Sequence, residues 1–446
     1  MSPSSEPTQQ HSTDDTMKRR TLIAASASLA TTLTTIEAES APAGGPAPAG
    51  NAEKQRPAQR MSAKVRFDDP DMDLFFMAAA SWGPTGGLDL GQVNYVASRI
   101  TDGDGESWIK AFSEYGDVMS AQADAWKAKG WRREAGEARM KAFAAYRSAW
   151  QFAEPGERFA RMVARHKATF VQAVQESRLP GTFFSAPYAG KTLPGAYFQN
   201  PDRNAPVVLV IGGADTCFED LFLTMGRNLL ERGYSVAMAD LPGQGITMAD
   251  GLYWEAEAEK PIAAVSDLLI ERFGAKPGHM ALVGLSLGGY FVARAAGAPG
   301  ASERWATVMA STPFPSPAEL FALSAHAAAA EDTRGAPTPA ALRARMVSLW
   351  KAGAKTPQEF IPKTTGMVAD PSKVTLPFLS ILGAGDSQVF ARQARDWHER
   401  IHSTKKSFVL LDASTGADGH VQVNNRLRLT QECVGWMDDL FGRSAA

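Results

Sequence analysis

The first part of the folded chain is patterned for helices. Between residues 65 and 179, apolar side chains return every three or four positions, and strand signals are few. Two apolar stripes consist of Trp108, Phe112, Tyr115, Met119 and Trp126, and of Phe159, Val163, Phe170 and Val174. Because an amphipathic helix must bury one face, we expect both stripes to lie in a core. The pattern predicts an N-terminal helical domain over residues 65–180, with His166 packed inside it rather than binding a ligand.

The pattern changes at Gly181, where short apolar runs begin to alternate with helical stretches. The runs are as apolar as strands buried on both faces. The predicted strands are residues 207–211, 235–239, 280–285, 305–310, 377–382 and 407–411. This alternation predicts an α/β domain over residues 181–446, with a mainly parallel sheet covered by helices. The interval between the fourth and fifth strands is too long for a simple crossover, so we expect a helical lid at about residues 313–376.

The N-terminal residues have a different composition, rich in Ser, Thr, Ala, Pro and Gly. Within them, Lys18-Arg19-Arg20 precedes a mildly apolar stretch at residues 22–36 and the small residues Ala41-Pro42-Ala43. This is the layout of an export signal, and the paired arginines resemble a twin-arginine signal. We expect a signal over residues 1–43, a disordered linker over 44–64, and a periplasmic or secreted protein, or a cytoplasmic one if the signal is not used. The apolar stretch is too short for a membrane-spanning helix, so no stable membrane insertion is expected.

Composition and charge narrow the possible partners. The chain has 446 residues, of which 44% are apolar and 21% charged, as in soluble globular proteins. With 46 basic and 48 acidic residues the net charge is −2, so the chain has no overall positive potential that would attract nucleic acid. The two cysteines, Cys217 and Cys433, are too few for a disulfide framework or a structural zinc cluster and are expected to be free thiols.

A possible nucleophile lies at the end of the third predicted strand. Gly284-Leu285-Ser286-Leu287-Gly288 matches the G-x-S-x-G pattern and runs directly into a helical stretch. A tight turn between strand and helix exposes the serine hydroxyl above the sheet and places a helix N-terminus behind it. The pentapeptide by itself also fits a glycine-rich turn that caps a helix. Its position between strand and helix favours Ser286 as a nucleophile.

A nucleophilic serine needs a base and a carboxylate that orients the base, in the chain order serine, acid, histidine. The histidines after Ser286 are His326, His398, His402 and His420. His420 stands in a polar loop between the last strand and the C-terminal helix, where it can reach over the sheet. The best acid is Asp386, which ends the penultimate strand in a glycine turn, and Asp418 is its rival. We therefore predict Ser286, Asp386 and His420 as a catalytic triad.

The oxyanion of a tetrahedral intermediate would need backbone donors from two places. One is the residue after the nucleophile, Leu287. The other is the loop after the first predicted strand, Gly212-Gly213-Ala214-Asp215, where we nominate Ala214, with Gly213 as the alternative. A plain glycine turn would have the same sequence. The later turn at residues 240–245 is expected to be architectural.

One motif suggests a different chemistry. Residues 398–402 read H-E-x-x-H, the two-histidine pattern of zinc proteases, within a helical stretch. Catalytic zinc needs three protein ligands and an open position, and no third histidine follows at the spacing of the extended motif. We therefore expect neither a metal nor another cofactor.

A family resemblance covers the chain from about residue 67 to its end. The matching stretches are Gly105-Glu106-Ser107-Trp108, residues 139–150 with Tyr146-Arg147, Leu193-Pro194-Gly195, Gly212-Gly213-Ala214-Asp215 with Glu219 nearby, and residues 240–245 and 284–289. The chain resembles alpha/beta hydrolases with an N-terminal helical domain, related to the fermentation-respiration switch protein. That group includes 2,6-dihydroxypseudooxynicotine hydrolase, fungal hydrolases that shorten polyketide pigment precursors, and a bacterial esterase acting on sulfonylurea herbicides. The resemblance implies an alpha/beta-hydrolase fold, a pocket for bulky, often aromatic, substrates between the two domains, and a homodimer.

Three functions remain open at this point. The first is hydrolysis of a carboxylic ester through an acyl-serine intermediate. The export signal favours this function, because an exported esterase would meet foreign or extracellular substrates. The second is hydrolysis of a carbon-carbon bond beside a ketone with the same triad, in which Glu319 at the entry to the lid could assist. The third is a non-catalytic binding protein that kept the fold, against which the intact triad pattern argues.

Overall fold

The structure is a computed structural model that describes residues 60–321 and 338–443. The predicted export signal at 1–43, most of the predicted linker and His326 lie outside these residues. The described residues belong to one compact unit. No helix among them is long and apolar enough to cross a membrane.

The helices before the sheet bury most of the two predicted stripes. They are α1 (Pro70–Ser81), α2 (Leu90–Ala97), α3 (Gly105–Ala128), α4 (Arg132–Ala149) and α5 (Glu157–Glu176). The carboxylates of Asp69 and Asp104 accept hydrogen bonds from the first turns of α1 and α3, which fixes where these helices begin. Trp108, Phe112 and Met119 of the first stripe are buried in α3, whereas Tyr115 and Trp126 are half-buried, and the whole second stripe is buried in α5. His166 is buried with it, as expected from its place in the stripe.

The sheet has eight strands in the order β1-β2-β4-β3-β5-β6-β7-β8. Its strands are β1 (Gly181–Tyr188), β2 (Lys191–Phe198), β3 (Val207–Ile211), β4 (Ser235–Ala239), β5 (Met280–Leu285), β6 (Trp305–Ser311), β7 (Phe378–Gly383) and β8 (Lys406–Leu411). The strands from β4 across to β8 run parallel, and β2 joins β4 antiparallel. All predicted strands agree with β3 to β8 within one residue, and the predicted α/β class is confirmed.

The hairpin of β1 and β2 was not predicted. Its first strand alternates between exposed and more buried positions, whereas β3 to β8 were recognised as continuous apolar runs. Its turn holds Ala189 and Gly190, both at positive φ (48° and 71°), the geometry of a tight hairpin turn. An edge strand with one solvated face lacks the long apolar run that marks a central parallel strand.

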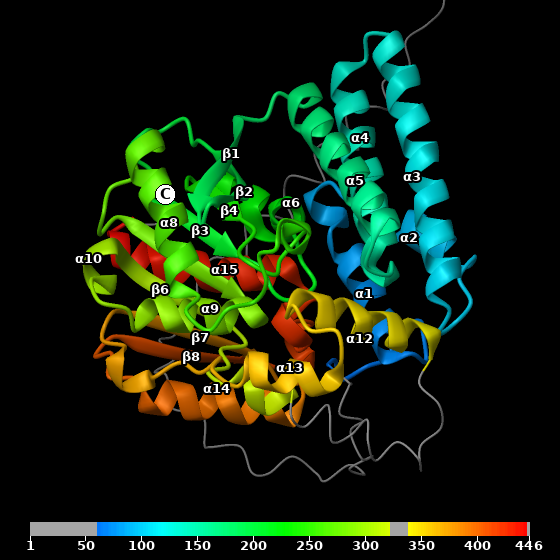
Figure 1. Ribbon diagram of the computed structural model, residues 1–446. Coiled ribbons are helices and arrows are strands. Elements are labelled where there is room, and N and C mark those ends of the chain that lie inside the picture. Colours follow the sequence, from blue (N-terminus) through cyan, green and yellow to red (C-terminus); the bar gives the residue numbers. More distant parts are fainter. Residues whose placement is uncertain (1–59, 322–337, 444–446) are drawn as a thin grey trace, which may run out of the picture. The chain divides into compact units, whose positions relative to one another are not determined.

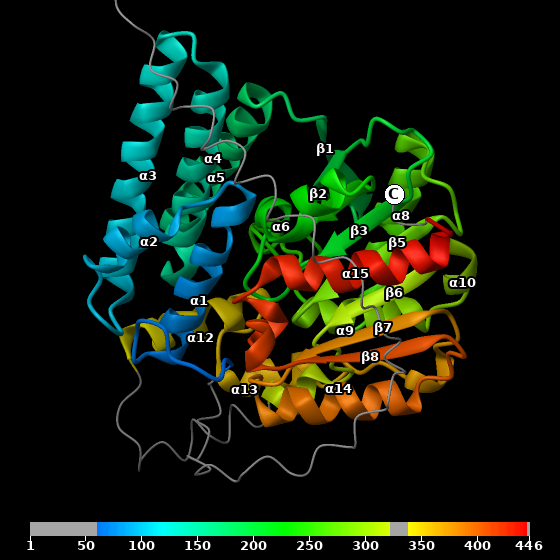
Figure 2. The ribbon, with the colours of Figure 1, turned by 180° about the vertical axis from the view of Figure 1, so that it is seen from behind.

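Helices cover both faces of the sheet (Figures 1 and 2). The helices after β3 are α6 (Phe218–Leu221), α7 (Arg227–Glu231), α8 (Glu259–Phe273), α9 (Leu287–Ala296), α10 (Ala301–Arg304), α12 (Pro339–Lys351), α13 (Pro357–Thr364), α14 (Gln388–Arg400) and α15 (Arg426–Phe441). Successive residues of β3 belong to opposite cores. Leu209 belongs to the core that includes residues of α8, α9 and α14, and Val208 belongs to the one that includes residues of α15 and of the N-terminal helices. The N-terminal helices therefore share one hydrophobic core with the α15 face of the sheet.

The segment between β6 and β7 contains α12 and α13, and part of it lies outside the described residues. Helix α12 contacts the N-terminal helices: the Ala340 amide donates to Gly103 O at 3.1 Å, and Arg343 pairs with Glu106 at 3.1 Å. Its Lys351 donates to the carbonyl of Ala214 in the loop after β3. The segment thus joins the N-terminal helices to the loops at the carboxyl ends of the strands.

Candidate active site

Ser286 lies in a strained turn between β5 and α9. Its backbone has φ 56° and ψ −121°, a conformation that side-chain-bearing residues rarely adopt. The two glycines of the motif make the turn possible. A Cβ on Gly284 would lie 2.2 Å from the Gly288 carbonyl oxygen, and a Cβ on Gly288 would lie 2.5 Å from that of Ile211. The motif therefore forms the sharp turn that its spacing predicted.

His420 reaches Ser286 from the loop between β8 and α15. Its Nε2 lies 2.8 Å from Ser286 Oγ, and its Nδ1 lies 2.7 Å from Asp386 Oδ2. The ring is buried, and the two residues after it, Val421 and Gln422, have φ of 47° and 51°. Since a carboxylate only accepts, Nδ1 carries the proton and Nε2 is free to accept one from the serine.

Asp386 rather than Asp418 contacts the histidine. Besides His420, its Oδ2 accepts from Thr312 Oγ1 at 3.0 Å, and its Oδ1 accepts from the Ser387 amide at 2.8 Å. Asp418 is hydrogen-bonded to other groups: it accepts from the Ser62 amide at 3.0 Å and from the Asn424 side chain. The structure therefore brings the three predicted triad residues together and places the rival carboxylate elsewhere.

The loop after β3, which contains two of the predicted oxyanion donors, lies beside the serine. A Cβ on Gly213 would lie 2.8 Å from the Cβ of Ser286, so this loop passes directly against the nucleophile. Leu287 follows the serine and begins α9, and Ala214 follows Gly213 in the loop after β3. The Gln244 side chain donates to the carbonyls of Gly212 and Gly213, at 2.6 and 2.9 Å. The turn at residues 240–245, expected to be architectural, thus holds the loop after β3 in place.

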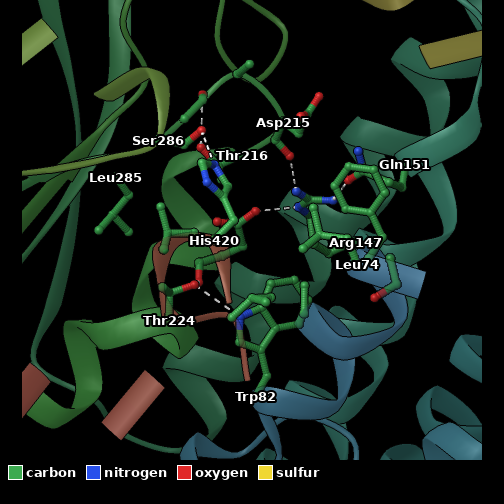
Figure 3. A pocket seen from close by; sticks show the side chains of 18 of the residues that line it. Leu74, Trp82, Arg147, Gln151, Asp215, Thr216, Thr224, Leu285, Ser286 and His420 are labelled. Atoms are coloured by element: carbon green, nitrogen blue, oxygen red, sulfur yellow. Dashed lines mark hydrogen bonds and ion pairs between the residues drawn. The ribbon is translucent and has the colours of Figure 1, made fainter. Parts of the chain in front are cut away.

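A cavity of about 80 Å³ opens beside Ser286 and His420 (Figure 3). Apolar side chains of the N-terminal helices form much of its wall, among them Leu74, Phe75 and the aromatic Trp108. Polar groups enter it from the same helices and from the loop after β3. The cavity therefore lies where the helices meet the carboxyl ends of the strands, which is the usual ligand position in α/β proteins.

Arg147 of α4 was not predicted as a site residue from its chemistry. Its Nε lies 2.6 Å from Asp220 Oδ2, and its Nη1 donates to Gln151 Oε1 at 3.0 Å. The guanidinium also lies 4.0 Å from the centre of the Trp150 ring. Burial lowers the pKa of Arg147, but the negative groups around it, Asp220 foremost, together raise the pKa overall. The only sequence signal was the Tyr146-Arg147 match to the family, since a single arginine in a helix does not reveal which way it points.

The H-E-x-x-H pattern does not form a two-histidine site. Helix α14 ends at Arg400, so His402 lies beyond the helix and is exposed. His398 remains in α14, where its Nδ1 lies 3.2 Å from Ser380 Oγ. The motif needs both histidines on one face of a continuous helix, and the helix stops before the second one.

Glu319 lies outside the cavity of Ser286. It pairs with Arg392 and accepts from Gln393 Nε2 at 2.9 Å, and it lines a separate hollow next to α14. The suggested assistance by Glu319 in carbon-carbon cleavage therefore has no geometric basis.

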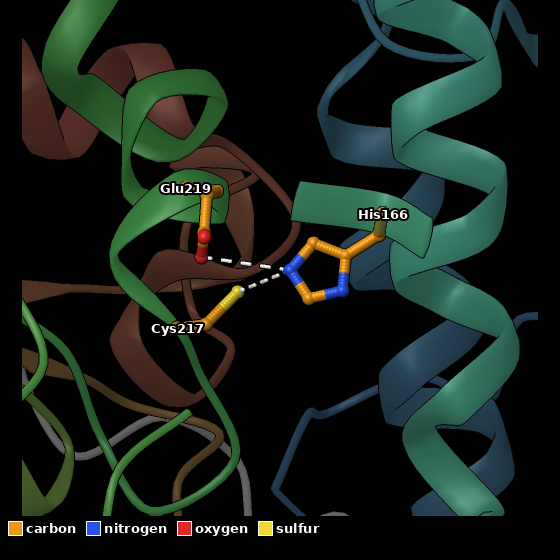
Figure 4. A group of neighbouring side chains, drawn as sticks. All are labelled: His166, Cys217 and Glu219. Carbon is orange, nitrogen blue, oxygen red and sulfur yellow. Dashed lines mark hydrogen bonds and ion pairs between the residues drawn. The ribbon is translucent and has the colours of Figure 1, made fainter. Parts of the chain in front are cut away.

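One group of side chains has the composition of a metal site. His166, Cys217 and Glu219 are buried, with His166 Nε2 lying 3.6 Å from the Cys217 sulfur and 3.5 Å from Glu219 Oε2 (Figure 4). However, the indole of Trp150 donates to His166 Nδ1 at 2.9 Å, so a neutral ring carries its proton on Nε2. Burial lowers the pKa of His166, which favours this neutral ring, and raises the pKa of the Cys217 thiol. A metal would need a free Nε2 lone pair and a thiolate, so this arrangement suits a hydrogen-bonding cluster instead.

Comparison with known proteins agrees with the fold. The prolyl oligopeptidase family matches residues 226–444. The chain is 31% identical over 252 residues to "Alpha/beta hydrolase psoB" of Aspergillus fumigatus. This match covers 52% of this chain and 57% of that protein. It is 30% identical over 236 residues to "20-hydroxy-prefusarin hydrolase FUS2" of Gibberella moniliformis, covering 48% and 54% of the two chains. The chain thus matches only a little over half the length of these relatives.

Solved structures match over a larger part of the chain. The crystal structure of the 2,6-dihydroxy-pseudo-oxynicotine hydrolase superposes with a TM-score of 0.63 at 18% identity, covering 82% of this chain and 97% of that one. The protein AbyA5 superposes with a TM-score of 0.60 at 16% identity, covering 84% and 95%. At such identities the match concerns the fold, and it includes the helices before the sheet. The chain therefore has the alpha/beta-hydrolase fold that the resemblance drawn from the sequence implied.

Proposed function

We propose that the protein is a serine hydrolase that cleaves carboxylic esters of bulky aromatic or heteroaromatic molecules through an acyl-serine intermediate. The observation that carries this proposal is the chain of contacts from Ser286 Oγ to His420 Nε2 at 2.8 Å and from His420 Nδ1 to Asp386 at 2.7 Å. These contacts supply a nucleophile, a base and an orienting carboxylate at the edge of one cavity.

The reaction follows from these positions. His420 Nε2 takes the proton of Ser286 as the hydroxyl oxygen attacks the ester carbonyl, and Asp386 stabilises the imidazolium that forms. The amides of Leu287 and of Ala214 or Gly213 would bind the oxyanion of the tetrahedral intermediate. Collapse of the intermediate breaks the ester bond, and the imidazolium gives its proton to the leaving alcohol. A water molecule, deprotonated by the same histidine, then releases the acid from the serine.

The cavity wall supports an aromatic substrate. The rings of Trp82, Trp108 and Phe75 line the cavity, and flat aromatic groups stack well against such surfaces. Two of the similar proteins are a 20-hydroxy-prefusarin hydrolase and a 2,6-dihydroxy-pseudo-oxynicotine hydrolase, which supports a hydrolytic reaction.

Carbon-carbon hydrolysis beside a ketone is the second candidate. It would use the same serine and histidine, but its carbanion leaving group must be protonated. The position of Glu319, paired with Arg392 away from the cavity, removes the additional acid suggested for that reaction. Ester hydrolysis, in which His420 alone can protonate the alcohol, is therefore the better proposal.

Substrate profiling with the purified protein and its Ser286→Ala variant tests the proposal. We expect turnover of nitrophenyl esters and labelling of Ser286 by a phosphonate in the native protein, and neither in the variant. A metal chelator should leave the activity intact. Activity on diketones but on no ester would favour carbon-carbon hydrolysis. A folded protein that neither turns over any substrate nor reacts with the phosphonate would support a binding protein instead.

We also propose that the protein is exported and forms a homodimer. The support for export is the Lys18-Arg19-Arg20 signal layout, and the support for a dimer is the family resemblance. N-terminal sequencing of the mature protein and light scattering test these points. A mature protein that still begins before residue 18, or a monomer at all concentrations, would contradict them.

A further inference from the structure

Arg426, the first residue of α15, lies in the wall of the cavity that contains Ser286 and His420. Its side chain is buried, with only 8% of the residue exposed. Nη1 donates to the carbonyl of Val421 at 2.8 Å, and Nε has no hydrogen-bond partner among the described residues. A guanidinium has five N–H donors, so this buried group is only partly satisfied.

The other charged groups of the cavity wall are paired. Arg60 lies 2.5 Å from Asp71, and Arg147 lies 2.6 Å from Asp220. The Asp215 carboxylate lies 3.5 Å from the Lys351 ammonium group. Arg426 is the remaining cation of the cavity wall. By contrast with the others, it forms no ion pair with a carboxylate of the described residues.

This charge persists at neutral pH. Burial lowers the pKa of Arg426 to about 10, and the Asp220 carboxylate opposes the shift. A buried charge without a counter-ion is unfavourable, because it has lost hydration without gaining an ionic partner. A ligand that brings a negative charge into the cavity would remove this penalty and satisfy the free donor.

We propose that Arg426 binds an anionic oxygen group of the substrate, a carboxylate or an equivalent oxyanion, while Ser286 attacks the ester. This inference rests on the proposed ester hydrolysis and narrows the substrate class to esters that carry a second, negatively charged group. Arginine suits this role because its planar donors match the two oxygens of a carboxylate.

A purely structural role for Arg426 has to be distinguished from recognition. Through Val421, the arginine contacts the loop that carries His420, so its loss could also displace the base. A displaced base would slow all substrates equally, whereas loss of an anion site would affect only charged ones. The ratio of activities toward charged and neutral analogues therefore separates the two roles.

The experiment compares esters that differ only in a carboxylate or a carboxamide. On the acyl side the pair is 4-nitrophenyl hydrogen glutarate and 4-nitrophenyl 4-carbamoylbutanoate, and on the alcohol side it is 3-carboxyphenyl and 3-carbamoylphenyl butanoate. In at least one pair we expect the carboxylate to be preferred by about tenfold or more in kcat/KM, mainly through KM, as expected for a charged hydrogen bond. Arg426→Gln should abolish this preference while it retains turnover of the carboxamide, and Arg426→Lys should keep part of it.

Binding without turnover provides a second measurement. In the Ser286→Ala protein, glutarate should raise Tm more than the neutral diamide glutaramide does, and 3-hydroxybenzoate should raise it more than 3-hydroxybenzamide does. Arg426→Gln should remove both differences. The proposal fails if the native protein prefers no carboxylate, if Arg426→Gln lowers both members of a pair equally, or if neither anion raises Tm. Failure of the ester-hydrolase proposal is recognised separately, as the absence of turnover of all four esters and of phosphonate labelling.

Discussion

Asp386→Asn exchanges one carboxylate oxygen for an NH2 group at constant size, and we expect it to remove nearly all esterase activity. In the native protein Oδ2 accepts from His420 at 2.7 Å and from Thr312 at 3.0 Å, while Oδ1 accepts from the Ser387 amide at 2.8 Å. A carboxylate satisfies all of these donors. An asparagine cannot, because only one end of its amide accepts hydrogen bonds.

The backbone decides how the asparagine is oriented. The amide of Ser387 can only donate, so the asparagine oxygen pairs with it and the NH2 group faces His420. The reverse orientation would leave a buried donor unpaired, at a cost of about 1–3 kcal/mol. Facing an NH2 group, the ring must carry its proton on Nε2, where it can no longer accept the proton of Ser286. The same tautomer error in serine proteases lowers kcat by about 10⁴-fold, which is about 5 kcal/mol in activation free energy.

The assay is kcat for 4-nitrophenyl butanoate, with Tm as the check on folding. Asp418→Asn is the matched control, because it makes the same chemical change next to the same loop, at a carboxylate that contacts Ser62 and Asn424 instead of the histidine. We expect its kcat to be nearly unchanged. A folded Asp386→Asn protein whose kcat stays within about tenfold of the native value would refute the reasoning. So would equal losses in the two variants.

Other expectations concern stability, measured by urea unfolding. Gly288→Ala should destabilise the protein by about 3 kcal/mol, because its Cβ would lie 2.5 and 2.6 Å from backbone oxygens. Gly435→Ala, whose Cβ would enter open space, should instead stabilise it by about 1 kcal/mol. Similar effects of the two substitutions would contradict this reasoning. Arg147→Ala should lower the free energy of unfolding by about 3–5 kcal/mol, because it leaves the Asp220 carboxylate buried without its partner. The double variant Arg147→Ala/Asp220→Ala should lose less than the sum of the two single variants, and strictly additive losses would argue against a stabilising ion pair. Partial burial raises the pKa of Asp418, but the hydrogen bonds it accepts lower it overall from 3.8. The ionised Asp418 carboxylate therefore stabilises the fold fully at pH values above 3.8, and this stabilisation is lost as the pH falls through the lower pKa of the folded protein. Asp418→Asn should thus lower the free energy of unfolding at neutral pH and lower it much less at about pH 3. An equal loss at both pH values would disprove the ionic contribution.

The sequence by itself was sufficient for the features that depend on neighbouring residues. The strands β3 to β8 were recognisable because a strand buried on both faces is a continuous apolar run, and the turn at Ser286 because its glycines remove the clashes of that turn. The β1–β2 hairpin escaped notice, since half-buried strands alternate and their signal is weak. Chain order and scarcity of histidine led to His420 and narrowed the acid to two candidates.

Tertiary structure decided which of those candidates meet. The sequence favoured Asp386 over Asp418 as the acid, but only the packing of β7 beside β8 places Asp386 against the imidazole. The carbonyl of Arg60, at the other end of the chain, accepts the His420 amide at 2.7 Å. The unpaired charge of Arg426 likewise depends on which carboxylates surround it. Periodicity and turn residues act over a few positions and are legible in a sequence, whereas the contacts of a site join segments hundreds of residues apart and exist only after the chain has packed.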